Sequence, residues 1–146
     1  MNPTELILTG ARPPALYRLA ANWNADFLVE PLTRQGWRGF YIEGQVVTSK
    51  EAFLRVSSAA MDFPTYSSHN WDAFEESIRD LSWAPAQGYV LIYDAVWHLA
   101  WHDREAWQMA RALLTDAVAF WRTKETPLYV LLNRTWWYAH DIQKLE

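Results

Sequence analysis

The amino-acid sequence predicts an α/β fold, in which helices pack against a small β-sheet. Two short and almost entirely apolar segments, YVLIY at 89–93 and PLYVLLN at 127–133, are typical of strands covered on both faces. Residues 103–124, between them, carry apolar side chains at helical spacing. The residues that line one side of this helix are Trp107, Ala110, Leu114, Ala117 and Trp121. Strand, long helix and strand form a βαβ unit, whose crossover we expect to be right-handed.

Size and composition favour a folded domain. A chain of 146 residues is expected to form one domain, residues 1–146. Hydrophobic residues make up 51% and charged residues 21%, as in globular proteins. The ten Trp, seven Tyr and six Phe supply large side chains for a core. Ten Trp exceed what one small core usually hides, so we expect some of them on a surface that meets a partner.

Several classes of protein are disfavoured by what the sequence lacks. Without Cys there are no disulfides, thiolate nucleophiles or Cys-ligated zinc. The first residues do not pair a basic segment with a long apolar one, and no apolar run approaches the length of a membrane span. We therefore expect a cytoplasmic protein without a membrane segment. A formal net charge of −4 and no basic patch argue against direct binding of nucleic acid and favour a basic protein partner.

The first 36 residues are expected to form an N-terminal extension, residues 1–36, that packs on the core. The segment LILTG at 6–10 suits a short strand. Pro13 and Pro14 stop any helix that precedes them. Residues 15–22 suit one or two helical turns.

The next elements are a strand and a helix. GFYIEG at 39–44 is aromatic and β-branched between glycines, which predicts a strand. Thr48 and Glu51 have the spacing of a capping box and predict a helix start. The apolar residues on one face of this helix are Phe53, Val56 and Ala60. Pro64 ends the segment.

A second helix is predicted from Asn70, which is a good N-cap. Its buried face is marked by the spacing of Trp71, Phe74, Ile78 and Leu81. Pro85 and Gly88 then break the chain before the strand at 89–93. After the last strand, the tail at 134–146 is expected to be helical and to lie on the core.

The second helix carries an acidic stripe. Asp72, Glu76 and Asp80 follow one another at i, i+4 and i+8, and like charges at this spacing destabilise a helix by roughly 0.2–0.5 kcal/mol per pair. Glu75 and Arg79 form a favourable pair that recovers part of that loss. A helix that retains repulsion between its own carboxylates indicates a surface used for recognition. The alternative interpretation is an ordinary helix face exposed to solvent.

The residues before this helix support recognition and also have structural alternatives. Tyr66 and Asn70 would place an aromatic anchor beside the carboxylates. Packing is the alternative role of Tyr66, and helix capping is the alternative role of Asn70.

At these residues the sequence resembles a known family. The pattern F-P-x-Y-x-x-x-N-W-D-A-F at 63–74 is similar to the signature of the barstar family, intracellular inhibitors of the ribonuclease barnase. The resemblance covers about residues 39–133, so we expect a barstar-like core at 37–133 followed by the tail. It implies a small three-stranded parallel sheet packed by helices.

The resemblance also implies a site. Inhibitors of this family place the loop and the second helix in the nuclease active site, where carboxylates occupy the positions of substrate phosphates. The partner-binding residues that follow are Tyr66, Asn70, Asp72, Glu75 and Glu76. The sequence departs from the family pattern in four places. Glu76 stands where the family has an Asp, Glu75 where a Trp is typical, and Ser68 where the loop has a Gly. The family also has an acid late in the helix before the last strand, at a position near Phe120, where this chain has no carboxylate.

The sequence thus predicts a stoichiometric inhibitor of a basic ribonuclease or related toxin, without catalysis, cofactor or metal. One alternative is a binding module of the same fold whose partner is not a nuclease. Another is a metal-dependent enzyme, because His98 and His102 have the i, i+4 spacing of zinc ligands. That spacing alone is weak, and the sequence lacks the Glu of an H-E-x-x-H motif.

Overall fold

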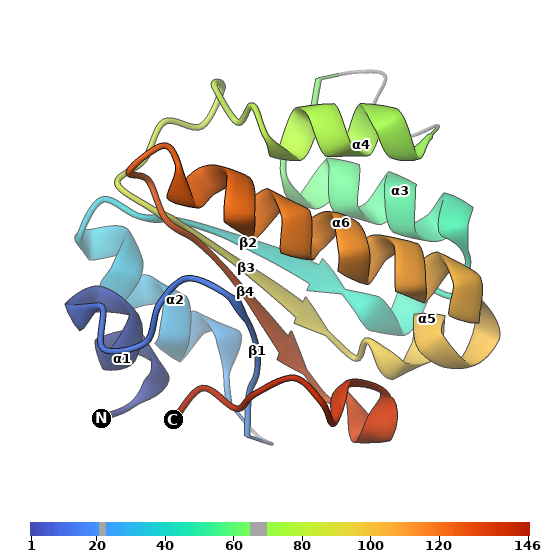
Figure 1. The fold of residues 1–146 in the computed structure, drawn as a ribbon, viewed down its shortest axis with the longest axis horizontal. Coiled ribbons are helices and arrows are strands. Elements are labelled where there is room, and N and C mark those ends of the chain that lie inside the picture. The colour runs from blue at the N-terminus through green and yellow to red at the C-terminus, as the bar shows by residue number, and fades with distance from the viewer. Residues whose placement is uncertain (21–22, 65–69) are drawn as a thin grey trace.

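The computed structural model describes residues 1–20, 23–64 and 70–146, and its centre is a parallel β-sheet (Figure 1). The sheet has four strands in the order β1-β4-β3-β2. All three neighbouring pairs are parallel. The strands are β1 (Leu16–Arg18), β2 (Arg38–Glu43), β3 (Tyr89–Asp94) and β4 (Leu128–Asn133).

Helices cover both faces of this sheet (Figure 1). One layer contains α3 (Lys50–Ala60), α4 (Trp71–Ile78) and α6 (Arg104–Arg122). The opposite layer contains α1 (Pro3–Thr9) and α2 (Ala25–Arg34), while the short α5 (Trp97–His102) follows β3. Alternate residues of β3 serve two cores, because Leu91 and Tyr93 pack with the first layer and Val90 and Ile92 with the second. The strand is therefore buried along its whole length, as its apolar sequence predicts.

The three strands predicted from the sequence are confirmed as β2, β3 and β4. The predicted long helix is α6, and it begins one residue later, where the Asp103 side chain accepts a hydrogen bond from the Ala106 N–H at 3.1 Å. The predicted cap of α3 was wrong by one residue. The Ser49 hydroxyl, rather than that of Thr48, accepts from the Ala52 N–H at 3.1 Å.

The prediction of three strands was wrong, because the N-terminal extension supplies a fourth. Leu16 pairs with Val130 of β4, so a strand stands within the segment expected to be helical. Its three residues are too few to show a period of two, and their partner lies more than a hundred residues away in the chain.

The expected strand at LILTG was also wrong, since these residues belong to α1. The Asn2 side chain accepts from the Glu5 N–H at 2.8 Å, and Pro3 occupies the first turn, where its missing N–H costs nothing. Gly10 ends the helix with a φ of 71°. A short apolar run suits a helix as well as a strand. The residues that cap its two ends therefore decide that this segment is a helix.

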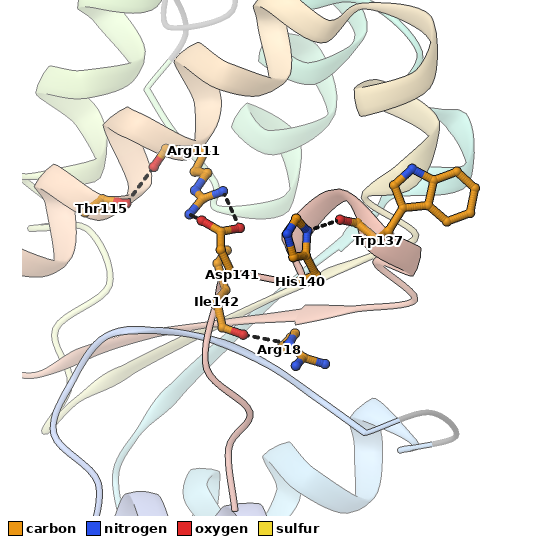
Figure 2. A network of polar contacts seen from close by, with 7 residues as sticks. All are labelled: Arg18, Arg111, Thr115, Trp137, His140, Asp141 and Ile142. Carbon is orange, nitrogen blue, oxygen red and sulfur yellow. Dashed lines mark hydrogen bonds and ion pairs between the residues drawn. The ribbon is translucent and has the colours of Figure 1, made fainter.

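The tail ties the extension to α6 (Figure 2). The tail contains a short 3₁₀ turn, η2 (Trp136–Ala139), and an isolated bridge between Lys144 and Arg18, instead of the expected helix. Asp141 accepts two hydrogen bonds from the Arg111 guanidinium, at 3.1 and 2.6 Å. The Arg18 Nε of β1 donates to the Ile142 carbonyl at 2.6 Å. Both ends of the chain are thereby held against the sheet.

Candidate functional site

The acidic helix α4 begins at a well-formed cap. The Asn70 side chain accepts a hydrogen bond from the Ala73 N–H at 2.7 Å, as its position predicted. Asp72 lies in the first turn, where the positive end of the helix dipole favours a carboxylate. The capping role of Asn70 is therefore filled by a hydrogen bond within the chain.

Asn70→Ala is expected to lower the free energy of unfolding by about 1 kcal/mol, because the Ala73 N–H loses its acceptor. Urea titration followed by circular dichroism would measure this change. A matched control is Asn70→Asp, which retains a capping oxygen and should unfold close to the parent. Equal losses for both variants would contradict the capping role.

Aromatic packing holds α4 against the rest of the first layer. The ring of Phe53 on α3 lies 5.7 Å from that of Trp71 and 5.3 Å from that of Phe74, measured between centroids. Phe74 and Ile78 are buried, so the opposite side of α4 faces outward. This packing fixes which carboxylates reach solvent.

The outward side of α4 carries carboxylates that form no ion pair with another described residue. Asp72 and Glu76 are exposed, and Glu75 is half-buried. In the described part of the chain, no Lys, Arg or His comes within 4.0 Å of any of these carboxylates to form an ion pair. Their charge is therefore available to a partner.

The stripe is shorter than the sequence predicted. The helix ends at Ile78, and Asp80 lies in the turn that follows. The predicted pair of Glu75 with Arg79 is likewise absent from the ion pairs of the described residues. Arg79 instead places its guanidinium 5.4 Å from the ring centroid of Phe120 on α6. An aromatic ring can stabilise a cation that lies over its face, without a carboxylate. This contact explains why the i, i+4 spacing of Glu75 and Arg79 did not predict an ion pair.

A hollow of about 270 Å³ beside the start of α4 extends the acidic surface. It is lined by Glu51 of α3, Trp71 of α4, and Asp103 and Glu105 at the start of α6. Lys50 is the one cation among the described residues that line this hollow, and its ammonium lies 5.9 Å from the Trp71 ring centroid. Sequence reasoning missed this set, because its members come from three helices and share no local pattern.

One predicted site residue, Tyr66, lies outside the described residues, as does Ser68. The structure brings the other four predicted residues together, because they occupy the cap and the first two turns of α4. These are Asn70, Asp72, Glu75 and Glu76.

Comparison with known proteins assigns the family. Residues 37–133 match the family described as Barstar (barnase inhibitor). The protein belongs to the barstar family. The family name implies a protein partner for its members and an inhibitory rather than enzymatic role. None of the curated proteins compared with this chain matches it.

A solved structure of another protein has a similar architecture. The Aeropyrum pernix ORC2 protein, in ADPNP-ADP complexes, is similar with a TM-score of 0.61 and 13% sequence identity. The match covers 94% of this chain and 40% of the ORC2 chain. At this identity the likeness concerns the fold alone. The barstar match also leaves out α1, β1 and α2, which precede residue 37.

The histidines that suggested zinc are engaged otherwise in this barstar-family chain. His102 Nδ1 lies 2.9 Å from the His98 carbonyl oxygen, and the His98 ring stacks on Trp97 at 3.7 Å. Over the residues that the structure describes, no three His, Asp or Glu side chains gather as metal ligands would. The described helices also include none with the length and apolarity needed to cross a membrane.

A second polar cluster lies at the carboxyl ends of β3 and β4. The buried Asp94 accepts hydrogen bonds from the Tyr41 hydroxyl at 2.9 Å and from Arg134 Nε at 2.9 Å, with a second bond from the same guanidinium. Burial raises the pKa of Asp94, but the hydrogen bonds from Arg134 and Tyr41 outweigh it and hold that pKa below 3.8. Burial and the bond to Asp94 raise the pKa of Tyr41 to about 12.

Arg134→Ala is expected to lower the free energy of unfolding at pH 6 by about 1–3 kcal/mol, since a buried carboxylate loses its cation. A carboxyl with a depressed pKa stabilises the fold above its ordinary pKa of 3.8, and this contribution disappears as the pH falls through the folded-state value. The difference between parent and variant should therefore shrink towards pH 2. Urea titration at both pH values measures it.

The matched control is Arg34→Ala, which breaks an exposed pair with Glu30 at 3.9 Å. Exposed pairs contribute about 0–1 kcal/mol, so this variant should change little at either pH. An Arg134→Ala loss that is as large in acid as at pH 6 would show that the guanidinium acts through packing rather than through the charge of Asp94.

Proposed function

We propose that this protein is a stoichiometric inhibitor of a basic ribonuclease or related toxin and that it acts inside the cell that produces the enzyme. The α4 carboxylates would enter the partner's active site and face the cations that bind substrate phosphates. The observation that carries the proposal is the acidic side of α4, whose carboxylates have no ion-pair partner among the described residues. Family membership over residues 37–133 supports it.

The chemistry of the contact suits inhibition. A carboxylate that leaves water to meet an Arg makes charge-assisted and often bidentate hydrogen bonds. Because α4 is fixed by the buried Phe74 and Ile78, little order has to be gained on binding. The three carboxyl groups of the hollow, on Glu51, Asp103 and Glu105, add negative potential that attracts a basic enzyme.

The side-chain lengths bear on which enzyme is bound. Glu76 reaches one methylene further than the Asp that the family pattern has at this position. A partner matched to this chain would hold its cation correspondingly further from α4. We therefore infer a cognate ribonuclease with its own spacing of active-site cations.

The test is an activity titration. The partner is captured from lysate of the source organism on the immobilised protein, purified and assayed for RNA cleavage. Inhibition should reach completion at one molecule of this protein per enzyme. A triple variant, Asp72→Asn, Glu75→Gln and Glu76→Gln, keeps the shape of α4 and should not inhibit. A captured protein that is neither a ribonuclease nor a toxin, or one bound equally by the triple variant, would refute the proposal.

A second candidate function is an interaction module with a partner that is not a nuclease. It is favoured by three exposed tryptophans, Trp101, Trp136 and Trp137, with exposed fractions of 67%, 57% and 62%. The Trp136 ring also stacks on Trp97 with 4.4 Å between centroids. Binding that survives the triple variant but fails with Trp136→Ala and Trp137→Ala would support this alternative.

A further inference from the structure

A pocket of about 840 Å³ lies on the face of the sheet opposite α4. The start of α2 forms one wall, with Trp23, Asp26 and Val29, and the sheet forms the other. Gly39 of β2 leaves room for this arrangement, because a Cβ there would stand 2.4 Å from Val29 Cγ1. Its volume lies within the usual range of small-molecule sites, roughly 300–1,000 Å³. Because α4 lies in the other helical layer, the pocket is separate from the proposed inhibitory surface.

The pocket extends from the start of β2 to the carboxyl ends of β3 and β4, and the carboxyl ends of parallel strands are where ligands bind in open α/β sheets. Asp94 ends β3, and its register partner Asn133 ends β4. Both side chains line the pocket, together with Tyr41 and Arg134. The Asp94 carboxylate is already occupied by Tyr41 and Arg134, which makes this part of the wall rigid.

Asn133 is the group in this wall whose bonding is incomplete. It is 9% exposed, and its Oδ1 accepts no hydrogen bond from any described residue. A buried amide oxygen without a donor costs about 1–3 kcal/mol, so a ligand that supplies the donor would recover that energy. Asn133 lines the pocket, and the binding that we infer requires its amide to rotate so that its oxygen and nitrogen face the ligand. An Asn amide pairs in bidentate fashion with an amino group beside a ring nitrogen, as adenine presents them.

The aromatic walls and the charge restrict the ligand further. Trp23 is half-buried and Tyr41 is 44% exposed, so both offer ring surface to a planar group. Aromatic faces of this kind stack on nucleic-acid bases. Two acidic residues, Asp26 and Asp94, line the pocket, and Glu43 lies near enough to Arg134 to interact with its charge. Arg134 is the one cation among the described lining residues. This excess of negative charge disfavours a phosphate.

From these contacts we propose that the pocket binds the base of an adenine-type ligand that carries no phosphate. The planar ring lies against Tyr41 and Trp23. The amino group and the neighbouring ring nitrogen pair with the Asn133 amide. Residues of the N-terminal extension complete the site, so it is not confined to the part that matches the family.

The test is a titration of ¹⁵N-labelled full-length protein with adenosine, inosine and adenosine monophosphate, followed by NMR. Adenosine should shift the side-chain amide of Asn133 and the Nε–H of Arg134 saturably. Inosine lacks the amino group and should bind roughly 3–10-fold more weakly, which corresponds to one lost hydrogen bond. Adenosine monophosphate should also bind more weakly than adenosine, because the acidic groups repel its phosphate.

Variants separate stacking from nonspecific contact. Tyr41→Ala and Trp23→Ala should each weaken adenosine binding by roughly tenfold, the typical effect of losing one stacked ring. Phe27→Ala is the matched control, because Phe27 lies on α2, whose start borders the pocket, but is 76% exposed and does not line the pocket. A thermal melt checks that each variant is folded, and Trp23→Ala keeps the test valid if Tyr41→Ala unfolds.

Absence of a saturable shift with adenosine would overturn the proposal. So would shifts confined to residues outside the pocket, tighter binding of the monophosphate than of the nucleoside, or equal weakening by Phe27→Ala. The outcome is independent of ribonuclease inhibition, because the measurement involves no partner protein.

Discussion

Glu76→Gln is expected to weaken the complex with the captured ribonuclease by roughly 100-fold, because the substitution leaves a cation of the partner desolvated and without its counter-charge. The glutamine has nearly the shape of glutamate and should leave α4 unchanged, so the loss reports charge. Surface plasmon resonance on the immobilised enzyme would measure it, and most of the change should appear in the dissociation rate.

The control is Glu30→Gln on α2, which removes the same charge from the opposite helical layer. Its complex should dissociate at the parental rate. Rising salt should slow association of the parent, because screening shortens the range of attraction, and should affect the triple α4 variant less. A parental association rate indifferent to salt, or equal effects of the two glutamine variants, would count against an electrostatic contact through α4.

Phe53→Ala is expected to lower the free energy of unfolding by about 3–5 kcal/mol. Its side chain is 0% exposed, and its ring lies 5.3 to 5.8 Å from those of Phe74, Trp71 and Tyr93. The substitution opens a cavity where α3, α4 and the sheet meet, and this cavity cannot close without moving α4. Urea titration measures the stability, and the same variant should also bind the ribonuclease more weakly.

Phe27→Ala provides a control of identical chemistry, since Phe27 is 76% exposed. Surface substitutions usually change stability by less than about 0.5 kcal/mol. If Phe53→Ala destabilised the protein no more than this control, Phe53 would not be the contact that joins α4 to the core.

The elements that local chemistry determines were predictable. Asn70 followed by an acidic turn marked the start of α4, and the apolar run at 89–93 marked a strand buried on both faces. The apolar spacing of Phe74 and Ile78 also identified the buried side of α4. The same spacing predicts that Glu76 lies on the exposed side of α4, and Glu76 is exposed in the structure.

Features that depend on distant partners were not predictable. Leu16 joins the sheet because β4 offers it a free edge. The residues next to Leu16 in the sequence give no sign of this pairing. Arg79 lies over Phe120 because α6 passes beside the end of α4, whereas local spacing favoured Glu75. The pocket at Asp94 required the start of α2 and the ends of two strands to meet. In each case the deciding contact joins segments far apart in the sequence.

The short strand β1 has a consequence for self-association. Without it, the six residues of β4 would present open backbone donors and acceptors along one side of the sheet. Such a side is a template for strand addition by another molecule and therefore a route to polymerisation. The first residues of this chain occupy that side with only three residues, Leu16–Arg18, and leave little for an incoming strand to copy. We therefore infer that β1 protects the edge of β4 from pairing with another molecule.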